Sequence, residues 1–155
     1  MNNIPIADYT SFDYNEEDIK SHQACAAIIK DSENRILMLD HIKLKFWTIP
    51  IGKVSLTEKV EEGLRKELRE EVNIEIKDFK IIKSYEKIYL RTKNKIRVLT
   101  KCYLFEILNY DGSIKNNEPD KHKSLKFMSL DEIENIPKIS DATKEAIKYL
   151  RTRKN

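Results

Sequence analysis

Short apolar runs and one long amphipathic stretch make up most of this chain. Two apolar runs, Gln23–Ile29 and Arg35–Leu39, flank the polar tetrapeptide Asp31–Asn34. This arrangement predicts a β-hairpin, and both strands are apolar enough to be largely buried. Phe46–Pro50 predicts a further short strand, because the proline ends it by removing a backbone donor.

The stretch from Ser55 to Val72 has the periodicity of a helix. It is rich in Glu, Leu, Lys and Arg and contains no proline. Its apolar residues recur every four positions, which places them on one stripe of a helix: Val60, Leu64, Leu68 and Val72. We therefore predict a helix over Ser55–Val72. Asn73 predicts the left-handed residue that caps this helix, because Asn tolerates that conformation better than most residues.

The second half of the chain returns to strand-like segments, which run from Ile74 to Ile107. Cys102–Leu108 is the most apolar of them and predicts a central strand covered on both faces. Asp111–Gly112 predicts a turn, Asn116–Lys123 predicts a polar loop, and Leu125–Met128 predicts one more strand.

Two helices are expected near the C-terminus. Ser129 and Asp131 suit the cap of a short helix that Pro137 ends. A final helix is predicted over Asp141–Arg151, with four apolar residues facing inward: Ala142, Ala146, Ile147 and Leu150. Roughly five to seven strands with two or three helices indicate an α+β fold in layers.

Length and composition suit one globular domain. The 155 residues are 40% apolar and 35% charged, so the apolar fraction is sufficient for a core and too high for a disordered tail. No linker or repeat divides the chain. We expect residues 21–155 to form a single domain and the acidic residues 1–20 to be an irregular lead-in.

The sequence predicts neither a membrane span nor a secretory signal. The longest clearly apolar stretch, Ala24–Ile29, is far too short to cross a bilayer. Cys25 and Cys102 lie in apolar segments and lack the spacing of a disulfide framework or a CxxC motif, so buried reduced thiols are expected. These features favour a cytoplasmic protein with no membrane partner.

Three carboxylates on the predicted helix are the first candidates for chemistry. Glu67, Glu70 and Glu71 are spaced i, i+3 and i+4, which makes them neighbours on the helix surface. Glu71 projects about 60° from Leu68, beside the apolar stripe. A carboxylate there is costly unless a cation or hydrogen bonds compensate it, and a hard divalent cation such as Mg²⁺ or Mn²⁺ would do so. The alternative is an ordinary solvated helix face paired with neighbouring basic residues.

The spacing around this helix resembles the Nudix box, a 23-residue motif. Its fixed and apolar positions match without a gap at these residues: Gly52, Glu58, Glu67, Leu68, Glu70, Glu71 and Ile74. Trp47–Pro50 is similar to the strand that enters the box. Asn117–Lys121 and Phe127–Ile133 are similar to the tail of members that act on nucleoside triphosphates. The resemblance covers roughly residues 22–150.

Three positions depart from the motif. Lys66 stands where the family has an arginine that orients the catalytic carboxylates, and lysine lacks the rigid two-pronged geometry of arginine. Asn73 replaces the closing glycine, which is the milder change. Ile51 replaces a glycine whose main-chain carbonyl is often a metal ligand in the family. None of these changes removes a metal-binding carboxylate.

The resemblance implies a Nudix-type α/β/α sandwich with a mixed, mostly antiparallel central sheet. It also implies an enzyme that hydrolyses a diphosphate bond in a nucleoside diphosphate linked to another group, most simply a (deoxy)nucleoside triphosphate or a related nucleotide. The partner is then a small nucleotide, and a homodimer is compatible with the family.

The same analogy assigns roles to individual residues. It implies that Mg²⁺ or Mn²⁺ is held by a set of oxygen ligands: Glu67, Glu70, Glu71, Glu118 and the carbonyl of Ile51. One of the glutamates acts as general base, with Glu58 and Lys66 as further catalytic candidates. For Glu118, an exposed loop glutamate without a role is the alternative.

The distribution of charge leaves two other functions open. The net charge is only +3, but Lys77–Lys101 holds nine Lys and Arg residues against Asp78 and Glu86. A basic edge beside an acidic metal site would suit an RNA 5′ end, so a cap or triphosphate pyrophosphohydrolase is one alternative. A solvated hairpin with edge lysines accounts for the same charges. The other alternative is a catalytically weakened nucleotide-binding sensor, favoured by Lys66 and Ile51.

The histidines do not predict a zinc site. His22, His41 and His122 lack a paired ligand spacing such as HxH or HExxH. Nor do the Cys and Ser residues near the motif have a histidine partner that would indicate a nucleophile triad.

Overall fold

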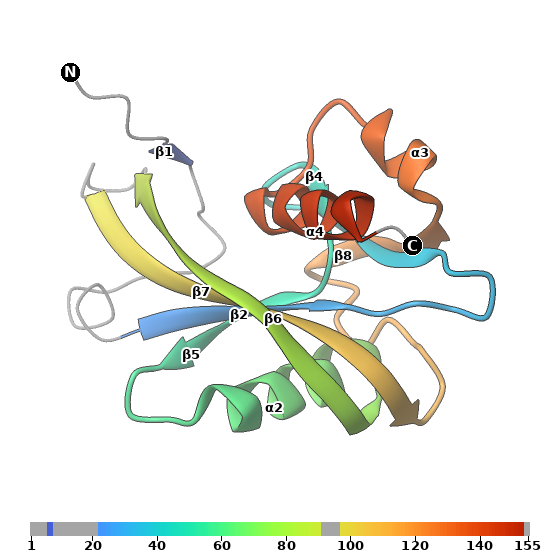
Figure 1. Cartoon of the computed structure of the whole chain (residues 1–155), viewed down its shortest axis with the longest axis horizontal. Coiled ribbons are helices and arrows are strands. Elements are labelled where there is room, and N and C mark those ends of the chain that lie inside the picture. Colours follow the sequence, from blue (N-terminus) through green and yellow to red (C-terminus); the bar gives the residue numbers. More distant parts are fainter. Residues whose placement is uncertain (1–5, 8–21, 91–96, 154–155) are drawn as a thin grey trace.

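Two β-sheets and the helices that cover them make up the computed structural model, which describes residues 6–7, 22–90 and 97–153 (Figure 1). The described residues form eight strands and three helices, in this order: β1 (Ile6–Ala7), β2 (His22–Ile28), β3 (Ile36–His41), β4 (Phe46–Thr48), β5 (Ile51–Ser55), α2 (Val60–Val72), β6 (Glu75–Leu90), β7 (Arg97–Asp111), β8 (His122–Met128), α3 (Leu130–Glu134) and α4 (Asp141–Thr152). None of the described helices is long and apolar enough to span a membrane.

The larger sheet is mixed. Its strand order is β1-β6-β7-β2-β5, with β6–β7 and β2–β5 antiparallel and with β1–β6 and β2–β7 parallel. The smaller sheet, β4-β3-β8, is antiparallel throughout. Cys102–Leu108 lies in β7 at the centre of the larger sheet, as its apolar run predicts. The predicted α+β class with a mixed sheet is confirmed.

Helices α2 and α4 lie on opposite sides of the larger sheet (Figure 1). Side chains of β2 alternate between the two interfaces, as the two-residue period of a strand requires. Cys25 and Ala27 pack in a core cluster with Leu64 of α2, whereas Ala26 and Ile28 pack in a second cluster with Ala146 of α4. Both faces of β2 are therefore buried from Ala24 to Ile28, which explains why this stretch is apolar throughout.

Helix α2 begins later than its sequence suggests. The prediction of a helix from Ser55 is wrong at its start, because Ile51–Ser55 is strand β5, paired antiparallel with β2, and the helix begins at Val60. Its end is confirmed: Asn73 adopts the left-handed conformation with φ 67° and ψ 36°. Gly63 is buried where the helix crosses β5, and a Cβ atom there would overlap the side chain of Val54.

The predicted hairpin forms only next to its turn, where Lys30 and Ile36 pair antiparallel, because β2 and β3 belong to different sheets. Its turn does form: the Asp31 N–H donates to the carbonyl of Arg35 at 3.0 Å, and the Leu37 N–H donates to that of Ile29 at 2.9 Å. Beyond the turn the strands diverge, and each finds two other partners. Two partners for each strand bury more apolar surface than an isolated hairpin would.

The helices and the last strand predicted in the C-terminal part of the chain are confirmed, with small shifts in their boundaries. Ser129 caps α3 through a capping box with Glu132, and Ser140 caps α4 by accepting a hydrogen bond from the Thr143 N–H. Strand β8 starts at His122, inside the predicted polar loop. Within the expected irregular lead-in, Ile6–Ala7 forms strand β1 beside β6, while the rest of residues 1–20 lies outside the described residues.

Candidate functional site

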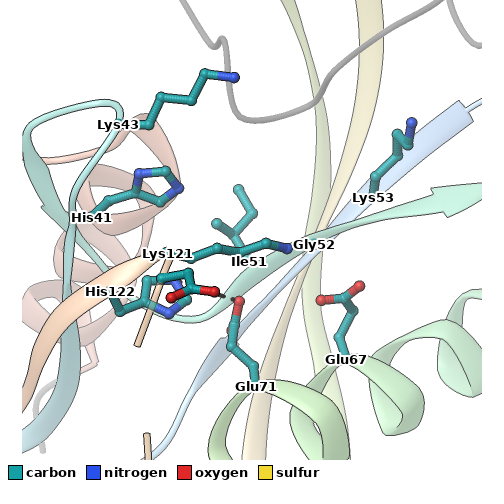
Figure 2. A pocket seen from close by; sticks show the side chains of 10 residues that line it. His41, Lys43, Ile51, Gly52, Lys53, Glu67, Glu71, Lys121 and His122 are labelled. Carbon is teal, nitrogen blue, oxygen red and sulfur yellow. Dashed lines mark ion pairs between the residues drawn. The ribbon is translucent and has the colours of Figure 1, made fainter. Parts of the chain in front are cut away.

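A cavity of about 420 Å³ lies where α2, the start of β5 and the start of β8 meet. Helix α2 contributes Glu67 and Glu71, and Figure 2 shows both carboxylates pointing from the helix towards the space between the elements. Ile51 and Gly52 of β5 line it, and His122 of β8 closes the opposite side. Residues far apart in the sequence thus surround one concave site.

Glu71 is the most deeply buried carboxylate of the cavity, with a relative exposure of 4%. Its Oε1 atom has no hydrogen-bond partner among the described residues. Burial raises the pKa of Glu71 well above its ordinary range, and the nearby charges of Glu67 and Glu118 raise it further. A buried carboxylate without a donor is costly to folding unless a cation compensates it.

Glu67 lies one helical turn before Glu71 and leans against the backbone of Gly52. A Cβ atom on Gly52 would overlap the carboxyl group of Glu67, so only glycine allows this close approach. Burial raises the pKa of Glu67 to about 7. The negative charges of Glu118 and Glu70 raise this pKa further, and the positive charge of Lys66 lowers it. The positive charge of Lys121 lowers it as well.

The loop before β8 is fastened to the C-terminal end of α2 by its backbone. The Lys115 N–H donates to the carbonyl of Val72 at 3.1 Å, and the Asn117 N–H donates to that of Glu71 at 3.2 Å. The last carbonyls of a helix have no partner within it, so these bonds satisfy them. They also bring Glu118, 47 positions after Glu71 in the numbering, to the end of the helix that carries Glu71.

Glu71, Glu118 and His122 form a group that fits a divalent cation. One ligand atom from each lies within 4.8 Å of the others. Two carboxylates and an imidazole are common ligands of divalent metals in proteins. The unpartnered Glu71 Oε1 atom is the observation that favours a cation here, because an ion bound there would compensate its burial.

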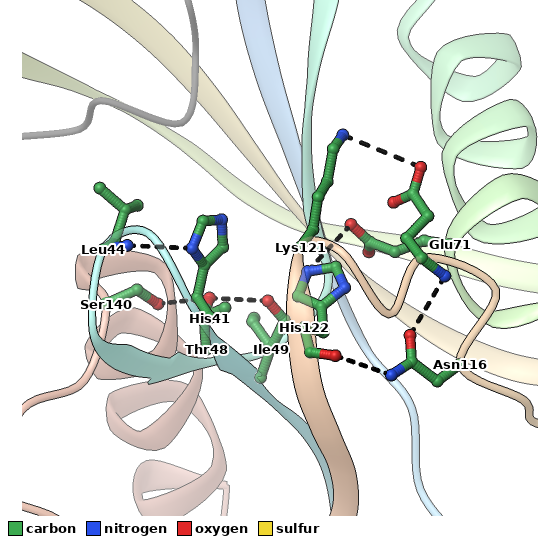
Figure 3. A network of polar contacts seen from close by, with 10 residues as sticks. His41, Leu44, Thr48, Ile49, Glu71, Asn116, Lys121, His122 and Ser140 are labelled. Carbon is green, nitrogen blue, oxygen red and sulfur yellow. Dashed lines mark hydrogen bonds and ion pairs between the residues drawn. The ribbon is translucent and has the colours of Figure 1, made fainter.

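Two histidines from adjacent strands stand side by side at the cavity. His41 and His122 are paired across β3 and β8, and their rings meet edge to face at 5.5 Å. The Leu44 N–H donates to Nδ1 of His41 at 3.2 Å (Figure 3). Burial, together with His41 and Lys121, lowers the pKa of His122 to about 4, so its imidazole is neutral at physiological pH.

Positive charge faces these carboxylates. Among the described residues, three lysines line the cavity: Lys43, Lys53 and Lys121. Figure 2 shows Lys43 and Lys53 on the far side of the cavity from the helix. Lys121 lies nearer the carboxylates, with its Nζ atom 3.8 Å from Glu118 Oε2. Carboxylates and ammonium groups lining one cavity are the arrangement expected for a metal ion and a polyphosphate bound together.

The other predicted site residues lie around the cavity and not in its lining, apart from Ile51. Glu70 and Lys66 are exposed on α2, and their charges act on Glu67. Glu58 is half-buried before the helix, and its carbonyl accepts a hydrogen bond from Gln23 at 3.4 Å. Their predicted catalytic and metal-binding roles stay predictions.

Cys25 of β2 is paired with Gly52 of β5 and is buried, as predicted. Burial and then the charges of Glu67 and Glu71 raise the pKa of its thiol far above the ordinary value. The thiol therefore stays protonated and is a poor nucleophile.

Sequence reasoning missed the histidines and lysines of the cavity. No spacing rule connects His41 to His122, because they are brought together by the pairing of β3 with β8. The only sequence signal was the position of His122 four residues after Glu118, in the segment that resembles the family's tail.

Comparisons with known protein families and solved structures find the same family. Residues 20–150 match the model of a family described as NUDIX domain. A MutT NUDIX hydrolase from Burkholderia pseudomallei is 25% identical to this chain in its crystal structure, with a TM-score of 0.66; the match covers 83% of this chain and 97% of that one. No curated protein matches the chain.

Two more distant structures share the fold. An Ap4A hydrolase from C. elegans, in a binary complex, is 18% identical with a TM-score of 0.61 over 84% of this chain and 95% of that one. The NUDIX domain of NrtR from Shewanella oneidensis, complexed with ADP ribose, is 14% identical with a TM-score of 0.67 over 90% of this chain and 93% of that one.

Proposed function

The chain belongs to the Nudix family and is a Nudix hydrolase acting on nucleotide diphosphate-linked substrates, and on that premise we propose that its substrate is a (deoxy)nucleoside triphosphate or a related small nucleotide. The observation that supports this proposal best is the cavity in which Glu67 and Glu71 face Lys43, Lys53 and Lys121. A compact site with both signs of charge suits a metal-bound polyphosphate.

The site's carboxylates would hold the divalent cations of the reaction, Mg²⁺ or Mn²⁺. We assign this role to Glu67 and Glu71 in the cavity, to Glu118 of the loop, and to the flanking Glu70 and the Ile51 carbonyl. When bound, such cations neutralise phosphate oxygens and acidify a coordinated water. The fit of the residues present rests on the buried, unpartnered Oε1 atom of Glu71.

The remaining steps belong to the chain's own side chains. Lys43, Lys53 and Lys121 bind the phosphate oxygens and hold the diphosphate bond over the carboxylates. A water oxygen attacks one phosphorus atom, the bond from that phosphorus to the bridging oxygen breaks, and a glutamate of the cavity accepts the proton of the water. Lys66, at the exposed surface of α2, lowers the pKa of Glu67 and so favours its charged form.

The basic segment Lys77–Lys101 supports an RNA 5′ end as the substrate less than its number of Lys and Arg residues suggests. In the described part of Lys77–Lys101, three lysines pair with acids, as Lys121 of the cavity does with Glu118: Lys77 with Asp111, Lys80 with Glu106 and Lys83 with Glu145. These three lysines lie on β6 and do not line the cavity, whereas the lysines of the cavity come from other elements. The small nucleotide is therefore the better candidate.

A panel of substrates tests the proposal. Nucleoside and deoxynucleoside triphosphates, ADP-ribose, a dinucleoside polyphosphate and triphosphorylated RNA are incubated with the protein in Mg²⁺ and in Mn²⁺, and phosphate and pyrophosphate release is measured. We expect turnover of a small nucleotide with a weak salt dependence. Hydrolysis of RNA alone, falling steeply with salt, would instead identify an RNA-end enzyme. Thermal stabilisation by a nucleotide without any product would identify a sensor.

A further inference from the structure

His122 presents an imidazole nitrogen to the same carboxylates. Its Nε2 atom lies 3.8 Å from Glu71 Oε2, which is too long for a hydrogen bond but within the span of two ligands on one ion. The side chain is buried, with a relative exposure of 2%, and its Nδ1 atom has no partner among the described residues. Neither a hydrogen bond from the described residues nor solvent therefore satisfies this Nδ1 atom.

The backbone holds His122 firmly in this place. Its N–H donates to the carbonyl of Glu118 at 3.0 Å, and its own carbonyl accepts from the Asn116 side chain at 2.8 Å (Figure 3). Asn116 in turn accepts a hydrogen bond from the Glu118 N–H at 3.1 Å. One small network thus fixes the loop that carries both Glu118 and His122. The ring of His41 packs against the other side.

We propose that His122 is a nitrogen ligand of the divalent cation held by Glu71 and Glu118. The inference rests on the proposed function, since it concerns the same metal site. Ligand atoms of the three residues lie within 4.8 Å of one another, so a small contraction brings them onto one ion. An imidazole nitrogen is intermediate between hard and soft ligands, and first-row transition metals bind it readily, whereas Mg²⁺ prefers oxygen. The site consequently favours a transition metal such as Mn²⁺ or Co²⁺ over Mg²⁺.

Pulsed electron paramagnetic resonance of the protein with Mn²⁺ tests the assignment without relying on activity. We expect a ¹⁴N coupling from a directly bound imidazole, which changes to that of ¹⁵N when the protein is labelled with [¹⁵N]histidine. His122→Gln should abolish the coupling. His41→Asn is the matched control, because its amide oxygen replaces Nδ1 as acceptor for Leu44, and it should keep the coupling.

Affinities measured by titration calorimetry give the second readout. We expect His122→Gln to weaken Mn²⁺ binding by roughly 10- to 100-fold. Its Mg²⁺ affinity should change by less than about threefold, because the glutamine amide supplies an oxygen in place of nitrogen. Equal losses for both metals would contradict a nitrogen ligand.

These experiments distinguish the claim that His122 is a metal ligand from the claim that the carboxylates bind a metal. Mn²⁺ that binds without a nitrogen coupling, or a coupling that persists in His122→Gln, would overturn the role of His122 and leave the carboxylate site intact. Absence of any Mn²⁺ binding would overturn the metal site and the proposed function together. If His122→Gln does not fold, the labelled wild type and His41→Asn still decide, because loss of the coupling in His41→Asn would assign the nitrogen to His41.

Discussion

At the scale of single residues, adjacent glutamates on α2 have very different surroundings. Glu70 is exposed, whereas the next residue, Glu71, is buried beside the apolar stripe of the helix. The rotation of 100° per residue is enough to explain the difference. The sequence predicted the position of Glu71 correctly, because this geometry is local. It did not predict the close approach of Glu67 to Gly52, which depends on the packing of α2 against β5.

Substitution of Gly52 should affect chemistry more than folding. In Gly52→Ala the new methyl group would overlap the carboxyl end of Glu67, which has to move away from the cavity. We expect turnover to fall by about 10- to 100-fold, because small misplacements of a catalytic group are costly. The free energy of unfolding should change by less than about 1 kcal/mol, since the displaced group is the end of a flexible side chain. Ser55→Ala, at the exposed end of the same strand, is the control. Full activity of Gly52→Ala would contradict the placement of Glu67.

The raised pKa of Glu67 predicts a pH dependence of stability in metal-free protein. Its carboxyl has a pKa of about 7 when folded, against 4.5 ordinarily. Between these values the folded state keeps a proton that the unfolded state has lost, so raising the pH destabilises the fold. Glu67→Gln lacks this effect. The stability of wild type relative to Glu67→Gln should therefore fall by about 1–3 kcal/mol from pH 4.5 to 7.5 in EDTA.

Urea denaturation of both proteins across that pH range provides the measurement. Comparison with the variant cancels the opposite contribution of His122, whose lowered pKa makes the fold more stable as the pH rises from about 4 to 6.5. Parallel stability curves for wild type and Glu67→Gln would show that the carboxyl of Glu67 is not perturbed by folding.

At the scale of elements, the end of α2 was predictable and its beginning was not. The apolar stripe and the left-handed Asn73 are properties of the local sequence. Ser55–Glu58 has an equally suitable composition for a helix start, but Ser55 is the last residue of β5. Pairing of β5 with β2, distant in sequence, decides that boundary. The divergence of β2 and β3 into two sheets has the same origin, because each strand gains partners from the second half of the chain.

Packing of α2 on β5 predicts the effect of a methyl group at Gly63. Alanine is a better helix former than glycine by about 1 kcal/mol, so Gly63→Ala would stabilise an isolated helix. In this fold the new Cβ atom would overlap Val54, and overpacking of this kind costs about 1–3 kcal/mol. We expect net destabilisation in chemical denaturation. The penalty should shrink in a Val54→Ala background, which makes room for the methyl group; an unchanged penalty would locate the strain elsewhere.

At the scale of the whole molecule, the site is assembled from one helix and both sheets. The family's motif predicted Glu67 and Glu71, and the tail after it predicted Glu118, because those signals are carried by spacing along the chain. His41, His122 and the lysines had no such signal, since their proximity arises from strand pairing and from the loop fastened to α2. The net charge of +3 likewise hides a cavity that gathers carboxylates and ammonium groups in one lining.

The central claim is that a metal-dependent hydrolysis takes place at the cavity that holds Glu71. The rate of hydrolysis by Glu71→Gln at saturating Mg²⁺ or Mn²⁺ tests this claim most directly. Turnover of the best nucleotide from the substrate panel is compared between wild type, Glu71→Gln and Glu62→Gln, the last being an exposed residue of the same helix. We predict that Glu71→Gln loses at least about 10²- to 10³-fold in turnover, since loss of one group that stabilises charge in the transition state costs that much. Its circular dichroism should match wild type, and Glu62→Gln should be fully active. Wild-type turnover by a folded Glu71→Gln would contradict a metal-dependent reaction at this site.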